Sequence, residues 1–154
     1  APPSHRGAPL STRDVDTRSA IDEVVPEFDP VRLASVWDGC LSAPDWPHDP
    51  VWFHGDLHPG NLVALGGRLT AVVDFGECGI GDPAIDAIAG WWLFDGDTRG
   101  RFREAGGFEE PVWRRGQGWA LSMALLVLPY YAETNPGFAE VARRVIHEIL
   151  EDPN

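Results

Sequence analysis

The residues best suited to chemistry form one short segment, His54-x-Asp56-x-His58-x-x-Asn61, followed 13 residues later by Asp74-Phe75-Gly76. Both acids are expected at strand ends that lead into glycine-containing turns, where backbone bends direct side chains toward a common point. One carboxylate and one amide supply the few hard oxygen ligands that Mg²⁺ takes from protein when phosphates and water provide the rest. The other carboxylate is then free to accept a proton.

Phosphotransferases use this arrangement: one Asp orients a substrate hydroxyl, an Asn binds one Mg²⁺, and the Asp of Asp-Phe-Gly binds Mg²⁺ that bridges the ATP phosphates. In this sequence Asp56 takes the catalytic position, and Asn61 and Asp74 are the metal ligands.

Three neighbouring residues are expected to support this site rather than react. We expect His54 to brace the catalytic loop from within and His58 to pack within the loop rather than to bind metal. Asp86, one turn into a helix that begins with Asp82-Pro83, is expected to accept hydrogen bonds from the backbone of the loop.

A metal-dependent hydrolase is the alternative from another enzyme class, because His54, Asp56, His58 and Asp74 also form a possible His/carboxylate metal site. Such sites usually draw on further histidines. The other three of the five histidines stand in contexts typical of surface residues, so a phosphotransferase is favoured.

Two longer stretches carry a family resemblance. His-Gly-Asp-Leu-His-Pro-Gly-Asn (54–61) and Val-Val-Asp-Phe-Gly-Glu-Cys-Gly-Ile-Gly-Asp-Pro-Ala-Ile-Asp (72–86) closely resemble the aminoglycoside phosphotransferase and choline kinase-like family. The segment 113–144, with Arg-Arg-Gly-Gln-Gly-Trp-Ala-Leu and Leu-Pro-Tyr-Tyr, is similar to its actinobacterial branch. The resemblance covers most of the chain after about Asp29.

The resemblance implies an α+β, mainly α fold: the C-terminal lobe of a protein-kinase-like fold, with a small β-hairpin that carries the catalytic and metal-binding turns. It also implies an ATP-dependent O-phosphotransferase that uses Mg²⁺ and acts on a hydroxyl of a small molecule. An aminoglycoside antibiotic is the first acceptor that it suggests.

In that fold a mostly β N-terminal lobe carries the Lys that grips the ATP phosphates, but this sequence has no Lys and only 53 residues before His54. We therefore expect the N-terminal ATP-binding lobe to be absent from this chain and the chain alone to be inactive. The surface that such a lobe covers is expected to be exposed and apolar. A catalytically silent, kinase-like binding module is the alternative.

Local patterns divide the chain into a linker or flexible segment over 1–15, rich in Pro, Ser, Gly and Arg, and the lobe itself over 16–154. Apolar periodicity and capping residues predict the elements of the lobe. Helices are expected over 16–25, 29–41, 82–93, 97–105, from 109 or 110 to about 132, and over 136–151; strands are expected over 51–54, 62–65 and 69–75.

Composition limits the partners. The chain has 24 acidic and 12 basic residues, all of the latter Arg, and a net charge of −12. This charge excludes nucleic acid and anionic membranes as expected partners and favours a cationic acceptor, bound between the catalytic loop and the helices after Asp82. No apolar stretch approaches the roughly 20 residues of a membrane-spanning helix. Two cysteines, Cys40 and Cys78, are expected to be unpaired thiols of a cytoplasmic protein.

Overall fold

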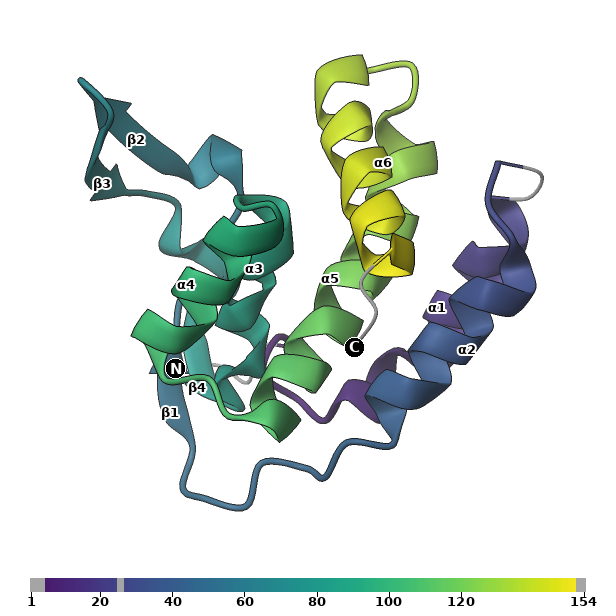
Figure 1. The fold of residues 1–154 in the computed structure, drawn as a ribbon, viewed down its shortest axis with the longest axis horizontal. Helices are drawn as coiled ribbons and strands as arrows, with labels where there is room; N and C mark the ends of the chain where they lie inside the picture. The colour runs from purple at the N-terminus through teal and green to yellow at the C-terminus, as the bar shows by residue number, and fades with distance from the viewer. Residues whose placement is uncertain (1–4, 25–26, 152–154) are drawn as a thin grey trace.

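The structure, a computed structural model, describes residues 5–24 and 27–151 of the chain. Its longest helix, α5 (Glu110–Tyr131), runs through the middle of the molecule and packs against α6 (Pro136–Glu151) (Figure 1). The helices α1 (Asp14–Glu23) and α2 (Pro30–Leu41) lie on one side of α5 and the short strands on the other. The expectation of a mainly α, α+β fold is confirmed.

A β-hairpin projects from the helical body (Figure 1). It consists of β2 (Leu62–Leu65) and β3 (Arg68–Val72), paired antiparallel. Gly66 and Gly67 join the strands with φ of 58° and 77°, and such positive values at both central residues are those of a tight type I′ turn. The predicted second strand, 69–75, is too long, because Asp74 has a left-handed backbone that cannot continue a strand.

A second strand pair leads into the motif region. β1 (Val51–Phe53) pairs antiparallel with β4 (Gly79–Gly81), with Trp52 opposite Ile80. The sequence does not predict β4, because two of its three residues are glycine, which carries no strand signal.

The predicted helix over 82–93 is two elements. Asp82 accepts a hydrogen bond from the backbone N–H of Ala84 at 3.0 Å and so caps a 3-10 helix, Pro83–Ile88, which continues as the short helix α3 (Ala89–Trp92). A tight 3-10 turn is common where a helix begins. The next helix, α4 (Gly96–Gly106), agrees with the prediction within a residue at each end.

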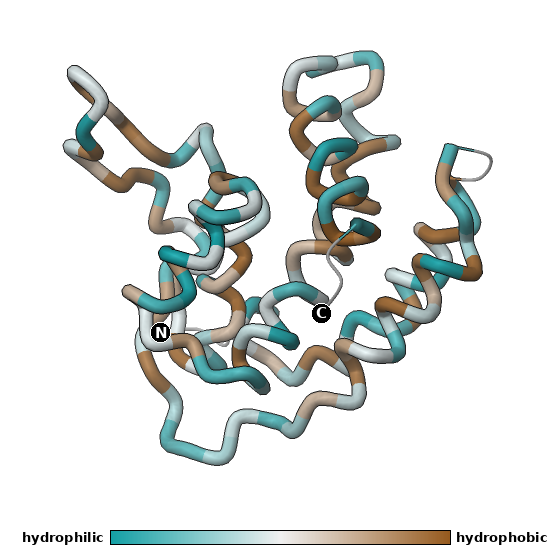
Figure 2. The backbone as a smooth tube through the Cα atoms, in the orientation of Figure 1, coloured by the Kyte–Doolittle hydropathy of each residue, from teal (hydrophilic) through white to brown (hydrophobic). Residues whose placement is uncertain are grey.

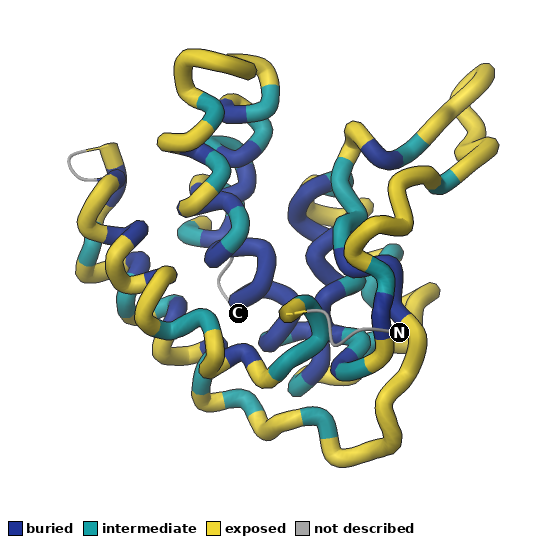
Figure 3. Tube along the Cα trace, turned by 180° about the vertical axis from the view of Figure 1, so that it is seen from behind, coloured by how far each residue is buried: buried dark blue, intermediate teal, exposed yellow. Residues whose placement is uncertain are grey.

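The core gathers around α5 (Figure 3). Its interior side chains come from α2, the 3-10 helix, α3, α5 and α6, and five of the seven tryptophans are buried in it. Trp91 and Trp92, which are adjacent on α3, are both completely buried. Among the described residues no helix combines the length and apolar composition needed to cross a membrane.

The N-terminal segment is not the linker that its composition predicts. Residues 1–4 lie outside the described residues, but Leu10–Arg13 form a 3-10 helix and Leu10 is buried against Gly118 of α5. The backbone oxygen of Gly7 accepts a hydrogen bond from the N–H of Asp82 at 3.0 Å. Long-range packing therefore orders a segment that is locally rich in loop-forming residues.

Asp82 and Arg115 form a buried ion pair. Arg115 Nε donates to Asp82 Oδ2 at 2.6 Å and Arg115 Nη2 to Asp82 Oδ1 at 3.1 Å, and the two side chains are 6% (Asp82) and 1% (Arg115) exposed. Arg115 Nη1 also donates to the carbonyl groups of Pro44 and Pro111. The pair thus joins the start of the 3-10 helix, the loop after α2 and the first turn of α5.

Arg115→Met is expected to lower the free energy of unfolding by about 3–5 kcal/mol, because it leaves the buried charge of Asp82 without its positively charged partner. The measurement is urea denaturation followed by circular dichroism. Arg114→Met is the matched control, since Arg114 is partly exposed on the same helix, and about 1 kcal/mol or less is expected there. Equal losses for the two variants contradict the assignment.

Candidate active site

The loop that follows β1 is held by Asp86. Asp86 Oδ2 accepts from the backbone N–H of His54 and Asp86 Oδ1 from that of Gly55, both at 2.8 Å. Gly55 has φ of 85°, and a Cβ there would lie 2.6 Å from the backbone oxygen of Glu77. The loop therefore needs glycine at this position, and Asp86 satisfies two of its backbone donors.

His54 connects the catalytic loop to the strand end before Asp74. Its Nδ1 accepts from the backbone N–H of Asp56 at 3.2 Å, and its Nε2 lies 2.9 Å from the backbone oxygen of Val73. An acceptor at Nδ1 places the proton of the neutral ring on Nε2, which donates to Val73. Both ring nitrogens are thus engaged with backbone groups.

One oxygen of Asp56 is held by two donors. Asn61 Nδ2 donates to Asp56 Oδ2 at 3.0 Å and to the Asp56 backbone oxygen at 2.9 Å. His58 Nδ1 accepts from the N–H of Gly60, so the proton lies on His58 Nε2, which is 3.4 Å from the same Asp56 Oδ2. His58 thus both packs in its loop and faces Asp56.

The other oxygen of Asp56 faces Arg6, which the sequence did not single out. Arg6 Nη2 lies 3.4 Å from Asp56 Oδ1, and Arg6 Nε lies 3.8 Å from Glu77 Oε2. Partial burial raises the pKa of Asp56, but the hydrogen bond from His58 and the charge of Arg6, together with the hydrogen bond from Asn61, outweigh it and lower the pKa below its ordinary value. Asp56 is therefore a carboxylate at neutral pH.

Asp74 lies beside this loop in an unusual backbone conformation. It is the one non-glycine residue with positive φ in the described part of the chain, at 60°, a conformation that costs on the order of 1 kcal/mol. Its Oδ1 accepts from Gly76 N–H at 3.3 Å, and the side chain is exposed. The preceding residue, Val73, donates its N–H to the backbone oxygen of Asn61 at 2.9 Å, which joins the two turns.

The oxygens of Asn61 and Asp74 suit Mg²⁺ bound together with phosphates and water. The side-chain nitrogen of Asn61 donates hydrogen bonds to Asp56, so the side-chain oxygen of Asn61 is the atom that can coordinate a cation. These two hard ligands are the number that a protein supplies when a nucleotide and water complete the coordination. Among the described residues no three His, Cys, Asp or Glu side chains are arranged to hold a metal by themselves.

The hydrolase alternative needs His54 as a ligand. A ring nitrogen that binds metal must present a free lone pair, and His54 uses Nδ1 as an acceptor and Nε2 as a donor to the backbone. This geometry disfavours a His/carboxylate metal site.

Comparison with known proteins decides the family. The model of the family described as "Phosphotransferase enzyme family" (APH) matches residues 1–119. The chain belongs to the phosphotransferase enzyme family. No curated protein and no solved structure matches it significantly. The match includes the motif stretches 54–61 and 72–86 of this phosphotransferase-family chain, and also residues 1–28, which the resemblance found from the sequence did not cover; of the segment 113–144 it includes only residues 113–119.

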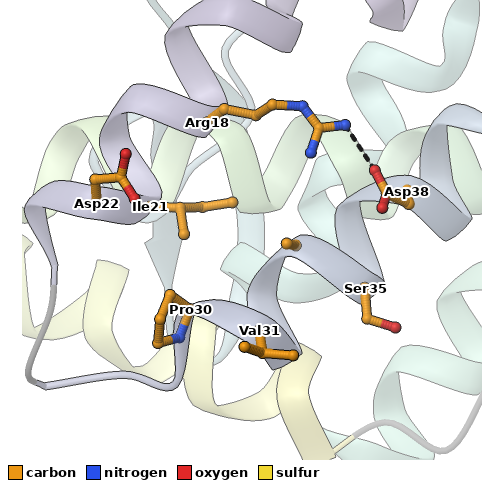
Figure 4. Close-up of a pocket in the computed structure, with 8 residues that line it drawn as sticks. Arg18, Ile21, Asp22, Pro30, Val31, Ser35 and Asp38 are labelled. Carbon is orange, nitrogen blue, oxygen red and sulfur yellow. Dashed lines mark hydrogen bonds and ion pairs between the residues drawn. The ribbon is translucent and has the colours of Figure 1, made fainter.

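A larger groove of this family member lies away from the motif residues. A groove of about 610 Å³ between α1 and α2 is bordered by Arg18 and Asp38, whose side chains form an ion pair at 2.6 Å (Figure 4). No motif residue is among the described residues that line it. Its size alone does not make it the candidate active site.

Arg6→Gln is expected to raise the pKa of Asp56, because the variant removes a positive charge that stabilises the carboxylate. The measurement is a pH titration of the ¹³C carboxyl signals of the chain, with the Asp56 signal assigned from Asp56→Asn. The folded-state pKa is lowered, so the stability that ionised Asp56 contributes is present above its unfolded-state pKa and is lost as pH falls through the folded-state value.

Arg143→Gln is the control for this titration, because Arg143 pairs with Glu27 and Glu140 on the surface. It is expected to leave the Asp56 signal unchanged. An unshifted Asp56 titration in Arg6→Gln shows that the ion pair is absent in solution.

Proposed function

We propose that this protein is an ATP-dependent O-phosphotransferase that acts on a hydroxyl of a small molecule. The observation that carries the proposal is the asymmetric environment of Asp56. Oδ2 is held by Asn61 and His58, which fixes the plane of the carboxylate and directs Oδ1 away from them. A fixed carboxylate, ionised at neutral pH, is the group needed to orient a hydroxyl and accept its proton.

In the proposed reaction the acceptor hydroxyl approaches Oδ1 of Asp56. The hydroxyl oxygen forms a bond to the γ-phosphorus of ATP, the bond from that phosphorus to the β,γ-bridging oxygen breaks, and ADP leaves while Asp56 takes the proton. His54 and Asp86 hold the backbone on both sides of Asp56, so the carboxylate needs little reorganisation during transfer.

Asn61 and Asp74 are the proposed ligands of Mg²⁺. These two side chains would hold the ion, which would supply positive charge to offset that of the phosphates during transfer. Asp74 has a left-handed backbone, and the hydrogen bond from the preceding Val73 to Asn61 joins the two turns that carry the proposed ligands. Strain of this kind is concentrated at functional sites, which supports a role beyond packing.

An N-terminal ATP-binding lobe outside these 154 residues is proposed to cover the strand side of the molecule. Much of the β-hairpin is hydrophobic (Figure 2) and yet exposed (Figure 3). Leu65 is 76% exposed, Trp52 72% and Phe75 57%, and the three come from both strand pairs and from the turn after Asp74. Large apolar side chains exposed near a candidate nucleotide site are typical of an interface.

The acceptor is proposed to be a hydroxyl compound, with an aminoglycoside as the first suggested by the resemblance. The acids on α4–α6 that favoured a cationic compound are in part already paired: Glu110 lies near Arg103 and Arg114, and Glu140 lies near Arg143. A panel of aminoglycosides, macrolides, choline and homoserine, offered with ATP to the full-length protein, tests the acceptor class.

Asp56→Asn is expected to lower the rate of phosphoryl transfer by about 10²–10⁴-fold, because the variant keeps the shape of the side chain but removes the base. The measurement is ADP formation by the full-length protein with its best acceptor. Asp45→Asn, in an exposed loop, is the control and should keep the parent rate. Activity of Asp56→Asn within a few-fold of the parent rules out this role, and absence of turnover in the parent protein favours a silent binding module.

Asp74→Ala is expected to raise the Mg²⁺ concentration needed for half-maximal activity steeply, because one of two protein ligands is lost. The measurement is a Mg²⁺ titration of ATP turnover in the full-length protein. Glu77→Ala, which removes a carboxylate three residues away, is expected to change this requirement much less. The same Mg²⁺ dependence in Asp74→Ala and the parent protein contradicts the ligand assignment.

A further inference from the structure

We propose that a cavity beside Asp56, on the α5 side of Arg6, is the acceptor pocket and that it selects a neutral or anionic hydroxyl compound with an apolar body. The cavity has a volume of about 200 Å³ and lies between the N-terminal segment and the second half of α5. The assignment of this cavity to an acceptor rests on the proposed phosphotransferase function. Its ligand preference rests on the side chains that line it.

Arg6 connects this cavity to the candidate base. Its Nη1 donates to the Sδ of Met123, which lines the cavity, at 2.9 Å, and its Nη2 lies 3.4 Å from Asp56 Oδ1. A single guanidinium group therefore spans from the cavity wall to the carboxylate oxygen that is not held by Asn61 and His58. A compound in the cavity can place a hydroxyl next to Oδ1 while it contacts Arg6.

The polar side chains along the cavity include two arginines and no carboxylate. They are Arg6, Arg13, His5 and Trp119, and among the described residues that line the cavity there is no carboxylate, amide or hydroxyl side chain. Arg6 faces Asp56 and Glu77, and Arg13 faces Asp16 at 3.3 Å, so these charges are partly compensated from outside the cavity. The lining thus offers two guanidinium groups to an anionic or neutral ligand and no carboxylate to an ammonium group, for which the ring nitrogen of a neutral His5 is an uncharged acceptor.

Trp119 forms part of the cavity wall, and its side chain is 2% exposed. Its Nε1–H is buried and has no hydrogen-bond partner among the described residues. A buried N–H without a partner costs about 1–3 kcal/mol.

The remaining wall is apolar and comes from one face of α5: Met123, Leu126 and Val127. Drug-sized ligands occupy about 300–1,000 Å³, so this cavity holds a smaller compound or one ring of a larger one. The three residues lie beyond residue 119, where the match to the family model ends. An aminoglycoside, which carries several ammonium groups, is poorly matched to a lining with two guanidinium groups and no carboxylate among its described residues.

The test is binding of three matched compounds to the 154-residue chain: 3-phenyllactate, 3-phenylpropane-1,2-diol and phenylalaninol. They share a benzyl group and a hydroxyl, and they are anionic, neutral and cationic, respectively. Kanamycin represents the aminoglycosides. Affinities come from the shift of the Trp119 indole ¹H–¹⁵N signal, identified as the signal that disappears in Trp119→Phe. We expect 3-phenyllactate and the diol to bind at least about tenfold more tightly than phenylalaninol and kanamycin, because only they offer acceptors without an ammonium group.

Two variants on α5 show whether this cavity determines the order of the affinities. Leu126→Glu puts a carboxylate into the lining and is expected to reverse the preference between 3-phenyllactate and phenylalaninol. Tyr130→Glu makes the same change in charge one turn further along α5 at a residue that does not line the cavity, and it should preserve the order. Both sites are exposed enough to accept Glu without loss of the fold, which circular dichroism checks.

Three results overturn the proposal: no binding of any of the four compounds at millimolar concentration, equal or tighter binding of phenylalaninol or kanamycin, or the same effect of both variants. Binding needs neither ATP nor Mg²⁺, so this outcome is independent of turnover. Binding in the expected order together with an inactive full-length protein retains a selective pocket and contradicts the phosphotransferase function instead.

Discussion

The buried pair of Asp82 and Arg115 is the interaction on which the rest of the molecule depends. Two charges removed from water are stable only when each is fully paired, and here that requires the loop after α2, the turn after β4 and the first turn of α5 to meet at once. Because Asp82 also donates its N–H to Gly7, the N-terminal segment joins the same point. Asp86 lies one turn further on, so the support of the catalytic loop forms together with the core rather than separately from it.

The proximity of site residues could be predicted from the sequence where these residues are close together in the chain. His54, Asp56 and Asn61 come from eight consecutive residues, and a tight hairpin returns the chain to Asn61 before Asp74, so their proximity follows from short-range geometry. The position of Asp86 one turn after a helix cap likewise suggested a side chain turned back toward the loop, and its carboxylate accepts from two of the loop's N–H groups. The helices over 29–41 and 136–151 were predicted from the residues at their starts and from the helical spacing of their apolar residues. In the structure the apolar residues of both helices contribute buried side chains.

Contacts between distant segments could not be predicted in this way. Arg6 is 50 residues from Asp56 and stands in a stretch whose Pro, Gly and Ser content indicates a loop, and only packing of Leu10 under α5 brings it to the site. The buried ion pair of Arg115 with Asp82 could not be predicted either. An arginine within a helix is usually solvated, and nothing in the local sequence shows that its partner is buried. Each motif histidine also accepts a hydrogen bond from the backbone N–H two residues later. The sequence did not predict these bonds, since they depend on the orientation of the ring.

The length of the β-hairpin does not affect the positions of the active-site residues at its base. The hydrogen bond from Val73 N–H to the backbone oxygen of Asn61 closes its base, so the positions of Asn61 and Asp74 do not depend on how far the two strands extend beyond that bond. The tip, Gly66-Gly67, is exposed, and a Cβ at either residue would meet no atom within 4 Å. Exposed tips of this kind tolerate insertions. The length of the hairpin can therefore vary without moving the active-site turns.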